Sequence, residues 1–339
     1  MGSKMRAKHL EMAIKTLIKT KKPLLIVGPP AVGKTKIAEA TADEICAEKG
    51  GSWMICHPVT DDPSDWKGLG FPSDDRLSAR FLPYGNLLEL MNADRLLICI
   101  MDDVGQSHDS VQAAIMQVIE ERTINGLKIS DHVRFILASN RKSDKAAVRG
   151  IIEPLKSRCC IVEMEVSTDD WCKWANIAGM PAELVAFARL RPQMLHDFKP
   201  SADMTNSPSP RGFEGVGRIM LADCPKEIEY EMFRGCCGDQ MATEFCGFLR
   251  VYREMPDPEA YINDPSKPLP TDESTLYALA AALATRANKT NVEKIFALAM
   301  RLDAEYSTFM VFSMIQRDKK LSQTAGMAIW SQKYSSYLM

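Results

Sequence analysis

Eight residues near the start of the chain, GPPAVGKT at 28–35, place two glycines, a lysine and a threonine at the spacing of a phosphate-binding loop. Gly28 and Gly33 allow the backbone to turn tightly, so that successive N–H groups can point at an anion. Lys34 can then reach the outer phosphates of a nucleoside triphosphate, and the Thr35 hydroxyl can ligate Mg²⁺. The motif therefore predicts binding of ATP or GTP. The residues predicted to contact the nucleotide are Gly28, Pro29, Pro30, Ala31, Val32, Gly33, Lys34, Thr35 and Lys36.

Two adjacent aspartates end the apolar run LLICIM at 96–101. A carboxylate at the tip of a buried strand, downstream of a phosphate-binding loop, typically holds Mg²⁺, often through water. We assign this role to Asp102; the alternative is an ordinary turn aspartate at the end of a strand. The second acid, Asp103, is the candidate catalytic carboxylate, because a carboxylate within hydrogen-bond reach can orient and polarise the attacking water.

A third polar residue, Asn140, ends the apolar run FILASN. It could hold the attacking water beside the γ-phosphate, or it could simply terminate a strand. The phosphate-binding loop and the two acids favour the catalytic interpretation. Lys34, Asp103 and Asn140 are therefore predicted to serve catalysis. Thr35 and Asp102 are predicted to hold the metal ion.

These side chains need strands that end beside one another. Apolar runs predict five strands, and apolar residues at helical spacing follow several of them. Strands that alternate with helices indicate a parallel sheet with helices on both faces. Asn125-Gly126 predicts a two-residue hairpin, and the turn-rich segment 60–95 is expected to hold one short helix near its end. The predicted strands are 23–27, 52–59, 95–101, 132–140 and 159–166, and the clearest helices are 7–20, 34–48 and 111–119.

The alternation of strands and helices stops after residue 166, and helical patterns dominate the rest of the chain. Two proline-rich stretches, 199–211 and 255–271, interrupt the helical part. We therefore expect an α/β nucleotide-binding core at 1–166, an all-α lid at 167–255 and a C-terminal helical region at 256–339.

The composition limits the possible partners. The chain has 339 residues, 46% of them hydrophobic and 25% charged, and a net charge of −2. This length suits two or three domains, and the charge gives no general attraction to nucleic acid or to an anionic membrane. Apolar runs fall short of the ~20 residues that span a bilayer, and no apolar signal region follows Met1, so we expect a cytoplasmic protein without a membrane partner. The ten cysteines include no CxxC pair and are expected to be buried reduced thiols.

The order of the motifs resembles one family. GPPAVGKT, LLICIMDDVGQ, VQAAIMQVIEERTING, ASN, EPLKSR and SPRGFEGVGRIM follow one another as in the MoxR branch of the AAA+ ATPases. The similarity is greatest to the single-domain types grouped with dynein-related AAA proteins, and it covers roughly residues 5–220. It implies a P-loop ATPase fold followed by a helical lid, ATP and Mg²⁺ as cofactors, and a hexameric ring with ATP at the subunit interfaces.

The resemblance also implies roles for individual residues. Asn140 matches the position called sensor 1, and Arg211, after Pro210 at a helix start, matches sensor 2, an arginine that contacts phosphate from the lid. Arg158 matches the arginine finger that reaches the nucleotide of a neighbouring subunit, and Arg149 is an alternative finger. A guanidinium suits a finger because it can neutralise the charge of a transferring phosphoryl group.

Two short segments match inserts of the same family. The TING hairpin matches the insert that precedes sensor 1, and SARFLPYGNLLEL at 78–90 matches the helix-2 insert, where this clade places pore-facing elements. Phe81 and Tyr84 in the second segment therefore have two interpretations. They either grip a substrate in a central pore or pack beneath a loop.

The family carries glutamate where this chain has Asp103. Aspartate is one methylene shorter, and a misplacement of about 1 Å can reduce a rate on the order of a hundredfold. Every other part of the motif set is present. We therefore expect a real but slow ATPase.

Three functions remain under consideration. The leading hypothesis is a MoxR-type, chaperone-like ATPase that couples ATP hydrolysis to remodelling or maturing a partner protein. Family members commonly act beside a von Willebrand factor A domain protein, which here would be a separate polypeptide. The alternatives are a nucleic-acid motor or loader, against which the near-zero net charge argues, and a scaffold that binds ATP with little hydrolysis, which Asp103 favours.

Overall fold

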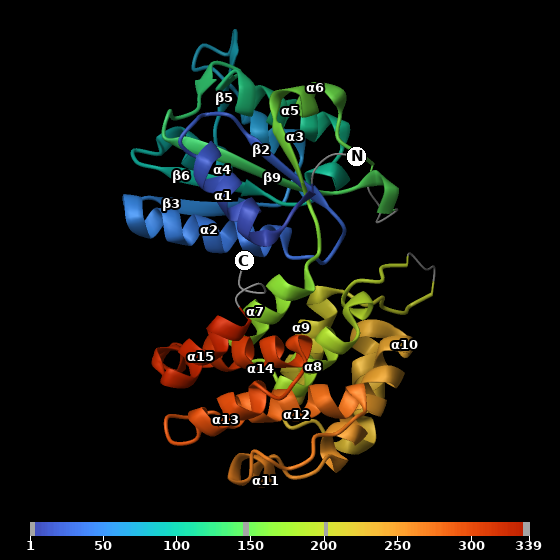
Figure 1. Ribbon diagram of the computed structural model, residues 1–339. Coiled ribbons are helices and arrows are strands. Elements are labelled where there is room, and N and C mark those ends of the chain that lie inside the picture. Colours follow the sequence, from blue (N-terminus) through green and yellow to red (C-terminus); the bar gives the residue numbers. More distant parts are fainter. Residues whose placement is uncertain (1–3, 145–148, 200–202, 335–339) are drawn as a thin grey trace. The chain divides into compact units, whose positions relative to one another are not determined.

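In the computed structural model, the chain divides into two compact units, Met1–Val166 and Ser167–Met339. The structure describes residues 4–144, 149–199 and 203–334. The first unit combines a sheet with helices, and the second is helical (Figure 1). This arrangement confirms the predicted fold class, a parallel α/β sheet followed by a helical region.

The first unit is built on a six-stranded sheet with the order β1-β10-β2-β9-β6-β3. All of its strand pairs are parallel, as the alternation of strands and helices predicts. Because the strands run in the same direction, β2, β6 and β9 all finish at one edge of the sheet. The strands are β1 (Lys4–Met5), β2 (Leu24–Gly28), β3 (Ser52–Cys56), β6 (Leu97–Met101), β9 (Val133–Asn140) and β10 (Cys160–Met164).

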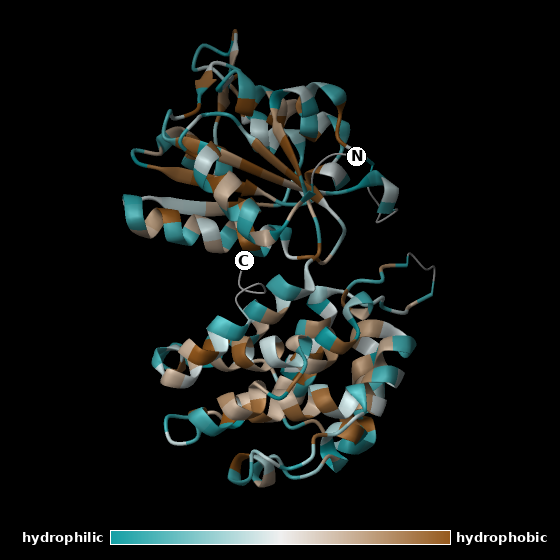
Figure 2. Ribbon diagram, viewed as in Figure 1, coloured by the Kyte–Doolittle hydropathy of each residue, from teal (hydrophilic) through white to brown (hydrophobic). Residues whose placement is uncertain are grey.

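The sheet separates two apolar cores, because successive side chains of a strand point to opposite faces. In β6, Ile98 and Ile100 pack with α1 and α2 on one face, while Cys99 and Met101 pack with α3, α4, α5 and α6 on the other. Strands covered on both faces are apolar along their length, as Figure 2 shows for this sheet. The predicted helices on both faces are thus confirmed. They are α1 (Ala7–Leu17), α2 (Lys34–Lys49), α3 (Pro63–Lys67), α4 (Gly85–Asn92), α5 (Asp109–Glu120) and α6 (Glu153–Arg158).

The segment 60–95 differs from the prediction of a single short helix. It contains both α3 and α4, and between them lies the antiparallel hairpin of β4 (Leu69–Pro72) and β5 (Ala79–Leu82). Phe71 and Phe81 on this hairpin are exposed. Its strands therefore lack the alternation of buried and exposed residues by which a sequence reveals a strand.

The hairpin predicted at Asn125-Gly126 is present as β7 (Thr123–Ile124) and β8 (Leu127–Lys128). Asn125 and Gly126 have positive φ angles of 49° and 79°, the backbone conformation of a tight two-residue turn. The sequence does not predict β1, because a strand of two residues is too short for any periodic pattern.

The second unit is formed by helices that pack around α8 and α12. In α12, eight consecutive residues from 277 to 284 are buried, and five of them are alanines, whose small side chains allow neighbouring helices to come close. This helix packs against α8, α10 and α14, so helices on both sides of residue 255 share one core. The helices are α7 (Thr168–Ile177), α8 (Ala182–Leu190), α9 (Pro210–Leu221), α10 (Lys226–Glu254), α11 (Pro258–Asn263), α12 (Glu273–Arg286), α13 (Val292–Ala299), α14 (Ala304–Arg317) and α15 (Ala325–Lys333).

A glycine breaks the long helix α10. Gly238 has φ 79° and ψ 173°, which is not a helical conformation. A Cβ atom at this position would lie 2.5 Å from the carbonyl oxygen of Asn206, closer than atoms can approach. Glycine is therefore required here both for its backbone freedom and for its lack of a side chain.

Candidate functional site

The predicted phosphate-binding loop lies between Gly28, the last residue of β2, and Lys34, the first residue of α2. Gly28 pairs in register with Asn140 of β9, and a Cβ at Gly28 would lie 3.1 Å from the carbonyl oxygen of Met164. Gly33 has a φ of 94°, a left-handed conformation that glycine adopts without strain. The backbone can therefore wrap an anion beside the first N–H groups of α2, where the helix macrodipole also favours negative charge.

The residues between the two glycines complete this loop. Ala31 has a positive φ of 60°, and Val32 is buried in the core that lies on the α1 and α2 face of the sheet. After the loop, Lys36 pairs with Glu39 one turn further along α2, at 2.6 Å. The Lys36 side chain thus has a partner on its own helix, and its predicted contribution to nucleotide binding depends on its backbone N–H.

Lys34 is buried inside the loop, with 6% of its surface exposed. Its Nζ donates hydrogen bonds to the carbonyl oxygens of Gly28 (3.2 Å) and Pro29 (2.7 Å) and to Oδ1 of Asn140 (2.8 Å). Burial of an ammonium group is costly unless its donors are satisfied, and these three neutral oxygens hold it in place. A positive charge is therefore fixed where the motif predicts the outer phosphates.

Thr35 and Asp102 form the candidate metal site. The Thr35 hydroxyl donates a hydrogen bond to Oδ1 of Asp102 at 2.8 Å. The backbone N–H of Asp102 donates to the carbonyl oxygen of Cys56 at 2.9 Å, so that the β3–β6 pairing extends one residue beyond β6 and fixes the acid. A hydroxyl and a carboxylate are hard oxygen donors of the kind that Mg²⁺ prefers. The donor set therefore fits the predicted ion.

Asp103 has a left-handed backbone, with a φ of 53°, and precedes the 3₁₀ helix Val104–Gln106. Aspartate is among the few residue types other than glycine that adopt this conformation readily. Oδ1 of Asp103 accepts a long hydrogen bond, 3.4 Å, from Nδ2 of Asn140. The Asn140 amide thus bridges Lys34 and Asp103. The residues that the structure brings together in this way are Lys34, Thr35, Asp102, Asp103 and Asn140.

The two candidate fingers lie in and before α6. Arg158, the last residue of this helix, donates a hydrogen bond to the carbonyl oxygen of Pro154 at 2.8 Å, and its Nε lies 3.6 Å from Oε2 of Glu120. Arg149 places Nη1 3.4 Å from Nδ1 of His108. These contacts connect both arginines to α5 and its start rather than to Lys34. The role of either arginine in a neighbouring subunit stays a prediction.

Arg211 belongs to the second unit, where it lies in the first turn of α9 and is exposed. Ser209 caps this helix, because its hydroxyl accepts a hydrogen bond from the N–H of Gly212 at 3.1 Å. The helix therefore begins as the sequence predicts. The contact of Arg211 with phosphate stays a prediction.

The two aromatic residues of the helix-2 insert have different surroundings. Phe81 on β5 is 43% exposed. The Tyr84 hydroxyl donates a hydrogen bond to Oδ1 of Asp65 at 2.6 Å, and this bond raises the pKa of Tyr84. The contact of Tyr84 matches the packing interpretation, whereas the exposure of Phe81 leaves it available for contact.

Sequence reasoning missed two residues near the site. Gln112 is fully buried and hydrogen-bonds three backbone groups, and a polar residue between the apolar residues of α5 was the available signal. Arg141 directly follows Asn140 and bonds Asp144 and Glu163, at 2.8 and 2.9 Å. The hydrogen bond to Asp144 raises the pKa of Arg141, and no pattern in the sequence indicates these contacts.

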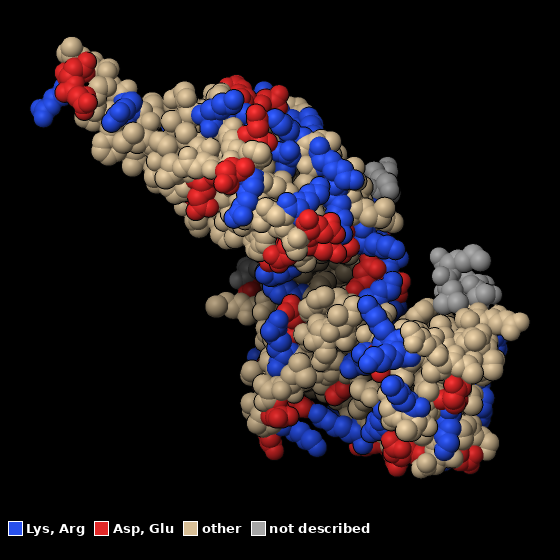
Figure 3. Space-filling view, turned by 90° about the vertical axis from the view of Figure 1, so that its left-hand side faces the viewer, with Lys and Arg blue, Asp and Glu red and all other residues tan. Residues whose placement is uncertain are grey.

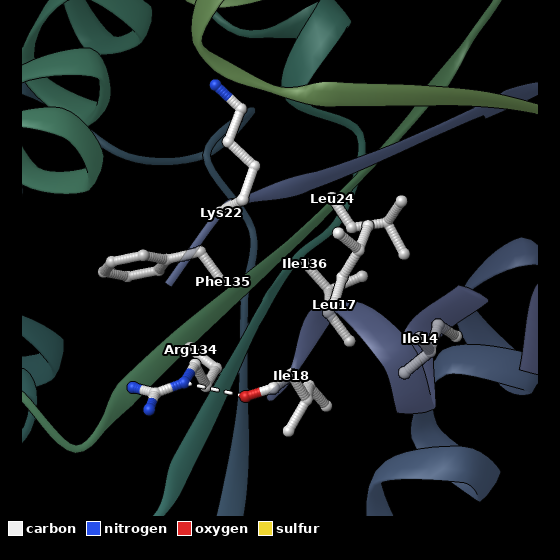
Figure 4. Close-up of a pocket in the computed structure, with 8 residues that line it drawn as sticks. All are labelled: Ile14, Leu17, Ile18, Lys22, Leu24, Arg134, Phe135 and Ile136. Atoms are coloured by element: carbon white, nitrogen blue, oxygen red, sulfur yellow. Dashed lines mark hydrogen bonds between the residues drawn. The ribbon is translucent and has the colours of Figure 1, made fainter. Parts of the chain in front are cut away.

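A small pocket in the first unit lies elsewhere, between α1 and the first residues of β2 and β9 (Figure 4). Nε of Arg134 already donates to the carbonyl oxygen of Ile18 at 2.9 Å, and the Lys22 side chain extends away from the apolar lining. Gly28 and Asn140 are the last residues of the same strands, so the pocket is at the opposite end from the phosphate-binding loop. It is not part of the candidate site. Its lining residues are Ile14, Leu17, Ile18, Lys22, Leu24, Arg134, Phe135 and Ile136.

The surface charge is mixed. On the face shown in Figure 3, Lys and Arg are interspersed with Asp and Glu, and the hairpin tip at the top of the view carries both signs. Such a face lacks the single-sign field that attracts a polyanion. Within the described ranges, no helix has both the length and the apolar character needed to cross a bilayer.

Comparisons with known proteins give only distant similarities. No family model matches the chain, and no curated protein matches it. The chain is similar to the AMPPCP-bound structure of DnaA from Aquifex aeolicus, with 14% identity over 99% of this chain and 96% of DnaA and a TM-score of 0.42. It is also similar to the Holliday junction branch migration motor RuvB of Thermotoga maritima (16% identity, 81% and 80% of the two chains, TM-score 0.39) and to NtrX from Brucella abortus (14%, 99% and 69%, TM-score 0.37). These TM-scores are too low to support an argument about function. The functional argument therefore depends on the geometry of the site.

Proposed function

We propose that this chain is a MoxR-type AAA+ ATPase that couples hydrolysis of Mg-ATP to the remodelling or maturation of a partner protein. One observation carries the ATPase part of the proposal. The Asn140 amide joins the buried ammonium of Lys34 to the carboxylate of Asp103, beside the contact between Thr35 and Asp102. The groups to which we assign phosphate binding, metal binding and water activation thus meet at one edge of the sheet.

In the proposed reaction, water attacks the γ-phosphorus, the bond to the bridging oxygen of ADP breaks, and inorganic phosphate leaves. Asp103 orients the attacking water and accepts its proton. Lys34 and the loop N–H groups stabilise negative charge on the outer phosphates. Asn140 hydrogen-bonds both the acid and the ammonium and so fixes their positions relative to each other. Mg²⁺ held by Thr35 and Asp102 would neutralise charge on the phosphate oxygens.

The proposed assembly is a homo-oligomeric ring in which each nucleotide also contacts a neighbouring subunit. Arg158, or Arg149 in its place, serves as the finger, and Arg211 contacts phosphate from the helical unit. A separate von Willebrand factor A domain protein is the proposed partner. These assignments rest on the order of motifs in the sequence.

Phosphate release by the purified chain tests the proposal. We expect slow, Mg²⁺-dependent release that Lys34→Ala abolishes, and ATP-dependent assembly measured by light scattering. Lys49→Ala, an exposed lysine at the end of the same helix, is the matched control and keeps both activities. Assembly with ATP but without phosphate release would indicate the scaffold function instead. Stimulation by DNA that falls steeply with salt would indicate the nucleic-acid motor.

Purification of the chain with its partners tests the second half of the proposal. ATP-bound chain is expected to retain a partner protein that is released on hydrolysis, and Asp103→Asn is expected to retain it longer. If the chain hydrolyses ATP but retains no such partner, the ATPase assignment stands and the remodelling role is excluded.

A further inference from the structure

Gln112 is a polar residue buried completely in an apolar core. It lies on α5 with 0% of its surface exposed, in a helix whose residues Val111, Ala114 and Ile115 belong to the same core. Burial of an amide is costly unless its donors and acceptor are hydrogen-bonded. The Gln112 amide therefore needs hydrogen-bond partners at this position.

All three described hydrogen bonds of the Gln112 side chain go to the backbone of two loops. Nε2 donates to the carbonyl oxygens of Ser107 (3.2 Å) and Gly150 (2.9 Å), and Oε1 accepts from the N–H of Ile152 (3.0 Å). A direct bond joins the same loops, from the N–H of Gly150 to the carbonyl oxygen of Gly105 at 3.1 Å. Both donors of the amide are thus used to hold the loops together.

The two loops belong to different parts of the candidate site. Gly105 and Ser107 lie in and directly after the 3₁₀ helix that follows Asp103. Ile152 caps α6, the helix that ends with Arg158. One buried amide therefore links the turn after the catalytic acid to the helix that carries the candidate finger. The alternative finger, Arg149, directly precedes the same loop.

The contacts indicate which of the two loops depends on Gln112. The turn after Asp103 has bonds of its own, since the N–H of Gln106 donates to the Asp103 carbonyl oxygen and the Ser107 hydroxyl donates to that of Val104. In contrast, the described backbone hydrogen bonds of residues 150–152 go to Gln112, to Gly105 and, from the Ile152 carbonyl oxygen, to the first N–H groups of α6. Loss of Gln112 would therefore remove two of the three bonds that join residues 150–152 to α5 and to the turn after Asp103.

We propose that Gln112 is a positioning residue for the arginine segment, residues 149–158, and that it holds this segment where its guanidinium reaches the nucleotide of a neighbouring subunit. This inference rests on the proposed ATPase function and on the proposed ring. It adds that an amide inside the subunit positions the finger. The turn after Asp103 in one subunit would thus help to fix the arginine that acts on the nucleotide of the next subunit.

The first test replaces Gln112 with methionine, which has nearly the same shape and no hydrogen-bonding amide. We expect kcat to fall about 10- to 100-fold, as for a misplaced catalytic group, while Kd for Mg-ATP changes by less than about twofold. Gln117→Met on the same helix is the matched control, because its side chain hydrogen-bonds no described residue. Thermal unfolding of both variants shows whether they fold. A folded Gln112→Met variant with unchanged kcat would overturn the inference.

The second test mixes variants within one ring. Gln112→Met keeps its own Lys34 and Asp103, whereas Lys34→Ala keeps an intact arginine segment. At an interface where the nucleotide of the first variant faces the arginine of the second, the site is complete. We expect an equimolar mixture to hydrolyse ATP faster than either variant alone. A purely structural defect of Gln112→Met would not be corrected in this way.

Reference mixtures separate the failure of this inference from the failure of the proposed function. Lys34→Ala mixed with Arg158→Ala, and in parallel with Arg149→Ala, should recover activity in the pair that contains the true finger. Recovery there, but none with Gln112→Met, would show that Gln112 acts on its own nucleotide and would overturn the inference alone. No recovery in any mixture of an active wild-type enzyme would overturn the shared site and the inference with it, while leaving the ATPase assignment standing.

Discussion

The ammonium of Lys34 donates a hydrogen bond of 2.8 Å to the side-chain oxygen of Asn140, although the two residues are 106 positions apart in the chain. The nitrogen of the same amide donates to Asp103 at 3.4 Å. The amide orientation is therefore set from both sides, with its oxygen toward the positive charge and its nitrogen toward the carboxylate. The residues proposed for phosphate binding and for water activation are thereby connected through one side chain.

Replacement of Asn140 by alanine removes this connection. We expect kcat to fall about 10- to 100-fold, because the acid and the ammonium lose their common partner. Kd for Mg-ATP should change by less than about tenfold, since Lys34 keeps its bonds to the carbonyl oxygens of Gly28 and Pro29. Steady-state phosphate release together with calorimetric ATP binding measures both constants. Equal losses in binding and turnover would place Asn140 in nucleotide binding alone.

Replacement of Asp103 by asparagine keeps the shape of the side chain but removes the proposed base. Turnover should fall about 10²- to 10⁴-fold, the usual contribution of a general base, with ATP binding retained. Single-turnover hydrolysis with labelled ATP measures this loss. Unchanged turnover would mean that another group activates the water.

Replacement of Asp103 by glutamate tests the consequence of the shorter acid. The bond to Asn140 is already at the long end of hydrogen-bond distances, so a longer side chain can bring the carboxylate closer to its target. We expect turnover to be kept or increased in the same single-turnover assay. Abolished turnover would show that the site is built around aspartate.

Replacement of Asp102 by asparagine weakens the candidate metal site. The Mg²⁺ concentration for half-maximal phosphate release should rise about 10- to 100-fold, as when a group that orients a metal-bound water is lost. EDTA should abolish the activity of the wild-type chain. An unchanged Mg²⁺ dependence would remove Asp102 from the metal site and leave it as a turn residue.

The ten cysteines should differ in reactivity according to burial. Burial raises the pKa of Cys159 to about 11 and the pKa values of Cys172 and Cys237 to about 12. At pH 8 these groups are therefore almost entirely in the unreactive thiol form. In a titration with Ellman's reagent, we expect the six buried thiols to react only after denaturation in guanidinium. Fast reaction of Cys172 in the native protein would contradict this. The buried cysteines are Cys46, Cys56, Cys99, Cys159, Cys172 and Cys237.

The sequence was sufficient for the elements whose pattern is local. The apolar runs that end at Gly28, Asp102 and Asn140 predict strands, and parallel strands place their ends together without further information. For this reason the proximity of these side chains could be predicted from motifs alone. The exact contacts, such as the amide between Lys34 and Asp103, require the strand order.

The features that the sequence did not reveal depend on contacts between distant segments. The hairpin of β4 and β5 is exposed, so its residues lack the alternating pattern that burial of one face produces. Gln112 could be recognised as unusual on an apolar helix, but its partners at Gly150 and Ile152 follow from the packing of α6 against α5. The position of a side chain in the sequence does not show which backbone groups of another loop it will meet.

The glycine that interrupts α10 has a consequence for the whole helical unit. Phe233 and Phe245 are 12 residues apart (245 − 233), a separation of about 18 Å along an unbroken helix, yet their ring centroids are 5.4 Å apart. The elbow at Gly238 thus turns one helix back on itself and lets it supply two walls of a single aromatic cluster that also contains Phe187. The lack of a side chain at Gly238 therefore allows the helical bundle to enclose this aromatic cluster.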